Sequence, residues 1–287
     1  MRDSDQQHDA VRSGYDRRSI LISSLSAGFA LSVQPLAASV INTDTQGLEV
    51  GEAKVPVLDG DIPAYFARPA AGGRYPVVIV IQEIFGVHEW IKDICRRFAK
   101  LGYLAVAPSL FARQGDALAY TDIQKLVSEI VSKVDDATVL SDIDATLRWA
   151  GLNKGDLDRV GVTGFCWGGR QTWLYTAHNQ TVKAGVAWYG HMVRREGSTQ
   201  PKHPVEVASG FRGRMLGLYG ELDKGIGANQ IEAMRAALKV ARDTKSEVIV
   251  YPGADHGFLA DYRPTYNEAA AKDAWARCLA WFKSHGV

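Results

Sequence analysis

Residues 159–178 read Arg-Val-Gly-Val-Thr-Gly-Phe-Cys-Trp-Gly-Gly-Arg-Gln-Thr-Trp-Leu-Tyr-Thr-Ala-His, and this stretch determines the fold that we expect. A β-leaning apolar run ends at Gly164, a helix-compatible run starts after Gly168, and Cys166 lies on the bend between them. This pattern is typical of a nucleophile elbow in which cysteine takes the place of serine. Because the turn is tight, a Cβ atom two residues before or after the nucleophile would clash, which explains the glycine at both positions.

The position of Cys166 at the start of a helix also favours its reactivity. Free N–H groups and the positive end of the helix dipole point at the sulfur and stabilise the thiolate, which is the nucleophilic form. The alternative is a buried cysteine in a glycine-rich turn, since free cysteines are among the most buried residues in proteins.

The composition is that of an ordinary globular protein. The chain has 287 residues, of which 46% are hydrophobic and 23% charged, enough for a full core in one domain. A formal net charge of +1 argues against a nucleic-acid-binding protein. Three cysteines, an odd number, imply no disulfide framework. A disulfide between Cys95 and Cys278, which lie on two predicted helices, is left open.

The amino terminus differs from the rest of the chain. It is polar and charged up to Arg17-Arg18, and residues 20–33 then carry no charge. This pattern predicts a twin-arginine-like export signal over residues 1–38, with cleavage near Ala38, and a mature domain over residues 39–287. We therefore expect a periplasmic or secreted protein without a stable membrane span after signal removal. A disordered or anchoring amino terminus is the alternative, and the protein would be cytoplasmic if no signal is present.

Beyond the signal, β-leaning and helical stretches alternate regularly. We expect strands at residues 55–58, 64–67, 77–81, 103–107, 183–189, 215–219 and 247–251, in addition to the strand before Cys166. We expect helices at residues 90–101, 121–150, 229–241 and 266–285, in addition to the helix after Cys166. Asp59-Gly60 predicts a hairpin between the first two strands. The alternation indicates one domain with a mostly parallel sheet covered by helices on both faces.

An acid and a base follow two of the later strands. Asp223 comes after the strand that ends at Tyr219, and His256 comes after the strand that ends at Tyr251. Catalytic groups collect at the carboxyl ends of strands in open α/β sheets. The order Cys166, Asp223, His256 is the order of nucleophile, acid and base in α/β-hydrolases. His256 would relay the proton, and Asp223 would fix its tautomer and stabilise the imidazolium.

Five segments, in this order, resemble those of the dienelactone hydrolase family: Gln-Glu-Ile-Phe-Gly-Val at 82–87, Ala-Pro-Ser-Leu-Phe-Ala-Arg-Gln at 107–114, Gly-Val-Thr-Gly-Phe-Cys-Trp-Gly-Gly at 161–169, Tyr-Gly-Glu-Leu-Asp at 219–223 and Tyr-Pro-Gly-Ala-Asp-His-Gly-Phe at 251–258. The resemblance covers roughly residues 50–285. It implies an α/β-hydrolase fold, a Cys-His-Asp triad, no cofactor and the activity of a carboxylic ester hydrolase. The name-giving substrate of that family is an unsaturated enol lactone.

The resemblance also implies roles that spacing alone does not supply. Glu83 matches a glutamate that helps to take the thiol proton when substrate arrives, although a solvated or helix-capping acid is the alternative. The N–H groups of Ile84 and Trp167 would then form the oxyanion hole. Arg113 matches an arginine that binds the substrate carboxylate, although a surface arginine in a loop would look the same.

One position departs from the family pattern. Family members that act on the dienelactone carry a second carboxylate-binding arginine four residues after the histidine, where this chain has Ala260. Arg263 lies three positions further on and either reaches the pocket or lies at the surface. His88, at the start of a predicted helix, could line the pocket, but a histidine at a helix start is more often at the surface. His191 and His203 lack the spacing of a metal site.

We therefore expect a hydrolase of carboxylic esters or lactones that works through an acyl-cysteine intermediate. Enol lactones and aryl esters should be favoured, because a thiolate is a better leaving group than an ordinary alkoxide. The alternatives are a non-catalytic binding or sensing protein on the same scaffold, and a cysteine-dependent peptidase or acyltransferase. The expected partner is a small-molecule ester or lactone, without nucleic acid, and the protein is expected to be a monomer or a small homo-oligomer.

Overall fold

The computed structural model describes residues 42–194 and 200–287. The predicted export signal, residues 1–38, therefore lies outside the described residues. Within the described part, no helix is long and apolar enough to cross a membrane.

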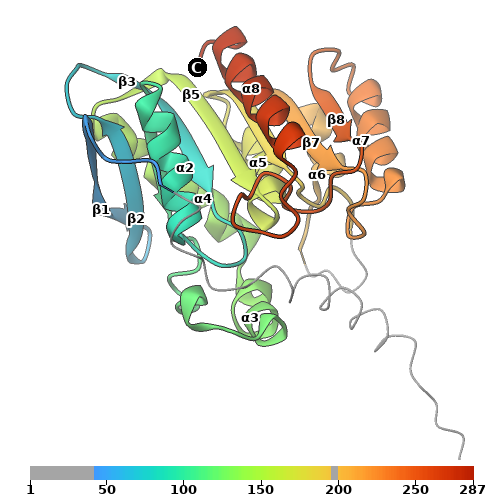
Figure 1. Ribbon diagram of the computed structural model, residues 1–287, viewed down its shortest axis with the longest axis horizontal. Coiled ribbons are helices and arrows are strands. Elements are labelled where there is room, and N and C mark those ends of the chain that lie inside the picture. Colours follow the sequence, from blue (N-terminus) through green and yellow to red (C-terminus); the bar gives the residue numbers. More distant parts are fainter. Residues whose placement is uncertain (1–41, 195–199) are drawn as a thin grey trace, which may run out of the picture.

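One sheet of eight strands forms the centre of the described molecule (Figure 1), in the order β1-β2-β4-β3-β5-β6-β7-β8. Its strands are β1 (Leu48–Val57), β2 (Gly60–Pro69), β3 (Tyr75–Ile81), β4 (Leu104–Pro108), β5 (Gly155–Phe165), β6 (Val182–Trp188), β7 (Arg214–Gly220) and β8 (Glu247–Tyr251). The predicted hairpin is confirmed, because β1 and β2 pair antiparallel and close at Val57 and Gly60. From β4 onward every neighbouring pair is parallel, which brings the carboxyl ends of β3 to β8 to one edge.

Helices cover both faces of the sheet, namely α2 (Glu89–Lys100), α3 (Ile123–Glu129), α4 (Asp136–Leu152), α5 (Trp167–His178), α6 (Pro204–Val207), α7 (Ala228–Val240) and α8 (Glu268–Ser284). Side chains alternate along a strand, so β3 contributes to two cores. Val78 and Val80 belong to a core with Phe98 of α2 and Phe282 of α8, the two helices that cross the near face in Figure 1. Ile79 belongs to a second core, which contains residues of α4.

The long helix expected at residues 121–150 is wrong, because the chain forms two helices there. Helix α3 ends at Glu129, a short 3-10 turn covers Val131–Lys133, and α4 begins at Asp136. The Asp135 side chain accepts a hydrogen bond from the N–H of Thr138, 3.0 Å away, and so caps α4. An N-cap fixes a new helix start even without glycine or proline before it.

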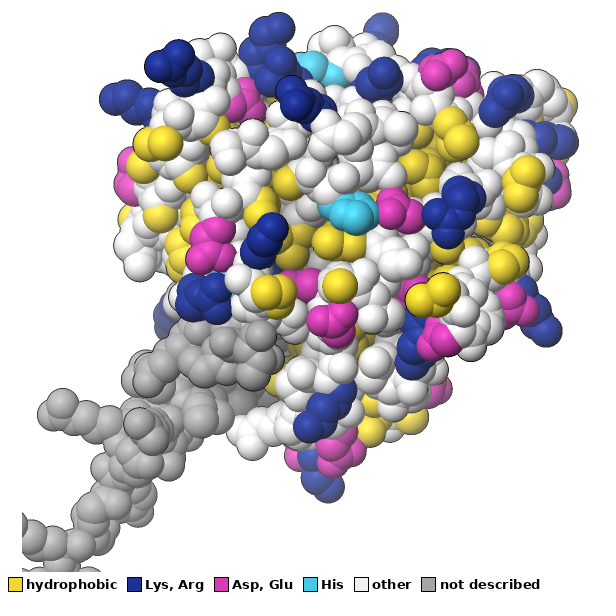
Figure 2. Space-filling view, turned by 180° about the vertical axis from the view of Figure 1, so that it is seen from behind, with side chains coloured by type: hydrophobic (Ala, Val, Ile, Leu, Met, Phe, Trp, Pro, Cys, Tyr) yellow, Lys and Arg dark blue, Asp and Glu magenta, His cyan; other side chains and the backbone are white. Residues whose placement is uncertain are grey.

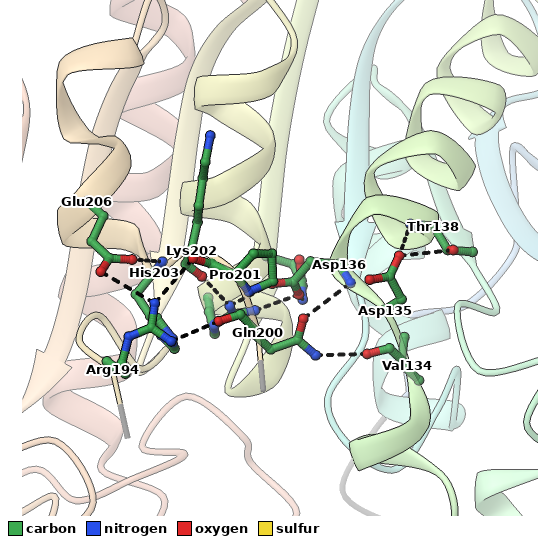
Figure 3. A network of polar contacts seen from close by, with 12 residues as sticks. Val134, Asp135, Asp136, Thr138, Arg194, Gln200, Pro201, Lys202, His203 and Glu206 are labelled. Carbon is green, nitrogen blue, oxygen red and sulfur yellow. Dashed lines mark hydrogen bonds and ion pairs between the residues drawn. The ribbon is translucent and has the colours of Figure 1, made fainter. Parts of the chain in front are cut away.

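Buried polar contacts hold α5, the helix that follows Cys166, against α4. Arg170 of α5 makes two hydrogen bonds of 2.7 Å with the carboxylate of Asp136 at the start of α4. Figure 3 shows the same region from close by, where the Gln200 side chain donates to the carbonyl of Val134 and accepts from the N–H of Asp136. These contacts hold the first turns of α4 and α5 together.

Charges of both signs are mixed on the surface. On the face shown in Figure 2, Lys and Arg side chains are interspersed with Asp and Glu side chains over the described residues, as expected for a net charge of +1. A polyanion approaching this face would meet acidic as well as basic groups.

Candidate active site

The turn at Cys166 has the geometry that the sequence predicts. Cys166 lies between β5 and α5 with φ 55° and ψ −114°. A positive φ is strained for a residue with a Cβ atom. A Cβ atom on Gly164 would overlap the carbonyl of Gly168, and one on Gly168 would overlap the carbonyl of Gln82. The glycine requirement at both positions is therefore confirmed, and the close approach places the elbow directly against the end of β3.

Asp223 and His256 meet at the same edge of the sheet. The Nδ1 atom of His256 lies 2.7 Å from Oδ2 of Asp223, although 33 residues separate them. Asp223 is 3% exposed, and its other oxygen accepts the N–H of Gly225 at 2.8 Å. Cys166 lies close enough to His256 to raise the pKa of its imidazole. The structure thus brings together the three residues predicted as nucleophile, base and acid.

Electrostatics favour a protonated His256. Burial acts to lower the pKa of His256, but the neighbouring Cys166 and Asp223 raise it to about 10. Burial acts to raise the pKa of Asp223, but His256 and the N–H of Gly225 more than offset this and lower it. An imidazole with such a pKa holds its proton at neutral pH.

Glu83 lies in a separate buried cluster. Its side chain is fully buried, and Oε2 has three partners: Arg263 at 2.9 Å, the hydroxyl of Tyr262 at 3.0 Å and Nε2 of His88 at 3.2 Å. The other oxygen, Oε1, has no hydrogen-bond partner among the described residues. Burial alone would raise the pKa of Glu83, yet the charge of Arg263 and the bonds from His88 and Tyr262 lower it to about 2.

The structure shows where two further residues of this cluster lie. His88 is 7% exposed rather than at the surface, because Glu83 binds its ring and Trp90 stacks on it. Arg263 is 4% exposed, and its guanidinium also lies over the rings of Phe85 and Tyr262. The sequence left open whether Arg263 lies in the pocket or at the surface. The structure shows that Arg263 points inward and pairs with Glu83.

Arg113 is engaged by carboxylates of the chain itself. It makes four hydrogen bonds, two with Asp59 and two with Asp142, at 2.5 to 3.0 Å. These ion pairs raise the pKa of Arg113 and occupy most of the five donors of a guanidinium. Arg113 lines a small cavity with Asp59 and Asp61, whose lining does not include Cys166 or His256. Its predicted role in binding a substrate carboxylate stays a prediction, and the arrangement described offers it little free capacity.

The two predicted oxyanion-hole donors come from segments in contact with one another. Trp167 is the first residue of α5, where N–H groups have no partner inside the helix. Ile84 lies in a tight loop that is closed by a hydrogen bond from the N–H of Gly86 to the carbonyl of Glu83. Because this loop directly follows Gln82, which touches Gly168, both N–H groups belong to the surroundings of Cys166. Their role as donors remains a prediction.

Tyr189 is a neighbour of the site that the sequence analysis did not identify. It is fully buried, its φ of 39° is unusual for a residue with a side chain, and its ring lies 5.0 Å from that of His256. A tyrosine at the end of a predicted strand carries no local signal of such strain, so only the structure reveals it.

The other two cysteines differ from Cys166. Cys95 and Cys278 are both free and fully buried, and burial raises the pKa of both thiols, which keeps them protonated. Over residues 42–194 and 200–287, no group of three or more His, Cys, Asp or Glu side chains is arranged to hold a metal ion.

Comparisons with known proteins show which proteins this chain resembles. A protein of Methylorubrum extorquens named "Putative carboxymethylenebutenolidase" is 53% identical over 287 residues, which cover 99% of this chain and 98% of the relative. A protein of the same name from Escherichia coli (strain K12) is 49% identical over 261 residues, or 91% of this chain and 96% of the relative. The crystal structure of a "Putative Dienelactone Hydrolase" from Klebsiella pneumoniae subsp. pneumoniae matches with a TM-score of 0.80 at 53% identity, over 82% of this chain and 98% of that chain.

The family model gives the same result. Residues 62–286 match the model of the dienelactone hydrolase family. The predicted resemblance and the α/β-hydrolase fold are confirmed, and a carboxylic ester hydrolase agrees with both findings. The chain therefore belongs to the dienelactone hydrolase family.

Proposed function

We propose that the protein hydrolyses activated carboxylic esters or lactones through an acyl-cysteine intermediate on Cys166. The observation that carries this proposal is the buried pair of Asp223 and His256 at the carboxyl edge of the sheet, with Cys166 close enough to His256 to raise its pKa. The names of the relatives, carboxymethylenebutenolidase and dienelactone hydrolase, support the same class of substrate.

The reaction divides into two steps. The Cys166 sulfur forms a bond with the carbonyl carbon, and the C–O bond to the leaving group breaks as His256 delivers a proton to that oxygen. Water then attacks the thioester and gives a proton to His256, and the C–S bond breaks to release the acid and the Cys166 thiolate. The N–H groups of Ile84 and Trp167 would stabilise the oxyanion in both steps.

Glu83 is proposed as an assisting base for the thiol proton. A carboxylate with a pKa of about 2 is a weak base, so its ion pair with Arg263 must loosen before it can act. The oxygen that would accept the proton is Oε1, which has no partner among the described residues.

The test compares leaving groups on the same acyl group. A thiolate is expelled from the tetrahedral intermediate in preference to an ordinary alkoxide, so we expect aryl esters and enol lactones to be hydrolysed with a far higher kcat/KM than alkyl esters. Mass spectrometry during turnover of a slow aryl ester should show one acyl group per chain, and none in Cys166→Ala. In Cys166→Ser, activity on aryl esters should fall and the relative preference should move toward alkyl esters. Similar kcat/KM values for aryl and alkyl esters in the wild type would contradict leaving-group selection by sulfur.

A further inference from the structure

Three donors meet on one oxygen of the Glu83 carboxylate. Oε2 accepts hydrogen bonds from Arg263 at 2.9 Å, from the hydroxyl of Tyr262 at 3.0 Å and from Nε2 of His88 at 3.2 Å. Oε1 has no hydrogen-bond partner among the described residues. A carboxylate has about four acceptor positions on its two oxygens. The three donors therefore leave free the oxygen that takes the proton in the proposed reaction.

The Tyr262 hydroxyl joins the two charged side chains of this cluster. It lies 3.0 Å from Oε2 of Glu83 and 3.0 Å from Nε of Arg263. Arginine can only donate, so the hydroxyl accepts from Arg263 and its single proton is directed at Glu83. Arg263 also donates to Glu83 directly through Nη2. The three side chains thus form a closed ring of hydrogen bonds in which the direction of each bond is fixed.

The Tyr262 hydroxyl keeps its proton at neutral pH. Burial and the charge of Glu83 raise the pKa of this hydroxyl, although Arg263 acts to lower it. An ionised hydroxyl could not donate to a carboxylate, so the raised pKa preserves the donor.

Packing holds the ring of Tyr262 in place. The ring makes edge contacts with those of His88 at 5.7 Å and Trp90 at 5.9 Å, both at the start of α2. One residue earlier in the chain, Asp261 pairs with Arg97 of α2 at 2.6 Å. The segment between β8 and α8, which passes beside α2 in Figure 1, is therefore held on that helix at two points. The hydroxyl has a defined position as a result.

The cluster and the elbow lie against the same residues. The Trp90 ring also packs at 4.8 Å on that of Phe165, the residue before Cys166. Burial raises the pKa of Tyr189, and Glu83 and Cys166 both act in the same direction. Tyr189 is therefore a neighbour of the cluster and of the nucleophile.

We propose that Tyr262 is a positioning residue for Glu83. Together with His88 and Arg263 it holds Oε2, which prevents the carboxylate from rotating and presents Oε1 as the proton acceptor. Because the Tyr262 ring is packed on α2, its hydroxyl keeps this orientation while the ion pair with Arg263 loosens. The inference rests on the proposed role of Glu83 as an assisting base and adds the residue that orients this base.

The variant Tyr262→Phe removes the hydroxyl and keeps the ring. Without this donor the carboxylate is oriented less strictly, so acylation in a single turnover of an aryl ester should slow by about tenfold, the effect of one hydrogen bond. The substrate concentration at half-saturation should stay unchanged, because Tyr262 acts on the base and not on the substrate. Urea unfolding would give the fraction of folded protein to which the rates are referred.

A double-mutant cycle separates positioning from a structural contribution. In a Glu83→Gln background no base is left to orient, so the addition of Tyr262→Phe should not slow acylation further. A tyrosine that only stabilises the fold would lower the rate by the same factor in both backgrounds.

The variant Tyr175→Phe is a matched control. The Tyr175 hydroxyl donates to Oδ1 of Asp144 at 2.9 Å and accepts from the side-chain amide of Asn179 at 3.0 Å. It therefore also joins a carboxylate to a nitrogen donor, but at the contact between α4 and the last turns of α5. The same deletion there should reduce stability and leave the acylation rate per folded molecule unchanged.

The outcomes separate this inference from the function on which it rests. A wild-type acylation rate in Tyr262→Phe, an equal loss in the wild-type and Glu83→Gln backgrounds, or an equal loss in Tyr175→Phe would overturn the role of Tyr262. A wild-type acylation rate in Glu83→Gln would overturn the role of Glu83 as a base, and this inference with it. Hydrolysis that persists in Cys166→Ala would overturn the proposed function itself.

Discussion

Asp223 and Glu83 are two buried carboxylates at the same edge of the sheet, and their partners give them different capacities. Both have a lowered pKa, and both are almost inaccessible to solvent. Asp223 binds His256, whose proton can move, whereas Glu83 binds Arg263, whose guanidinium keeps its proton. Asp223 can therefore act in the arrangement described, while Glu83 must first lose an ion pair. The residue type is not sufficient to predict the role of a buried acid, because the partner determines what its charge can do.

The largest loss of activity is expected from a substitution at Asp223. In Asp223→Asn the side chain can no longer hold His256 in the required tautomer or stabilise its protonated form, so kcat should fall about 10⁴-fold. Steady-state kinetics with an aryl ester would measure the loss, and urea unfolding would show whether the variant is still folded. A folded variant with nearly wild-type kcat would show that Asp223 only contributes to packing.

A substitution at Glu83 should lower the rate of acylation by a smaller factor. Glutamine cannot take the thiol proton, so Glu83→Gln should slow acylation by about 100-fold, the lower end of general base catalysis, with little change in substrate binding. Single-turnover kinetics would separate the two steps.

A matched control exists at the other buried Arg–carboxylate pair. Asp136→Asn also leaves a buried arginine, Arg170, without its carboxylate, but at the contact between α4 and α5. It should lose stability and retain its activity per folded molecule. Equal loss of acylation rate in both variants would mean that Glu83 acts only through the stability of its cluster.

The smallest effect is a pH dependence that distinguishes the two acids. The pKa of Glu83 is about 2 in the folded protein against 4.5 for a free glutamate, so the unfolded chain takes up the proton first. The stability that this group contributes is fully present above about pH 5 and is lost as the pH falls toward 2. Between pH 5 and pH 3, the free energy of unfolding of the wild type should fall by about 2 kcal/mol more than that of Glu83→Gln. Parallel curves in urea titrations would contradict the ion pair with Arg263.

Local patterns could be read from the sequence with good precision. The hairpin at Asp59-Gly60 and the glycines around Cys166 follow from steric requirements that act within a few residues. The break before α4 was missed because it depends on one capping aspartate, Asp135, in a stretch without glycine or proline. Polar side chains that cap a helix are easily taken for its exposed face.

Partners distant in the chain could not be read in this way. Glu83 and Arg263 are 180 positions apart, and Arg113 meets Asp59 and Asp142 across 54 and 29 positions. An arginine in a loop has the same sequence signature whether it faces a substrate, a buried glutamate or a surface aspartate. Ion pairing is decided by where the folded chain places the charges, and no periodicity records that.

The sequence by itself determined the elbow, the order of Cys166, Asp223 and His256, and the family to which the chain belongs. These follow from steric and covalent constraints between neighbouring residues and from the rule that parallel strands end at one edge. Only the tertiary structure decided that Glu83 is neutralised by Arg263 and that the Gln82 amide is left with an unpaired donor. The reason is physical: burial makes every unpaired polar group unfavourable, and which groups find partners depends on contacts that exist only after the chain has folded.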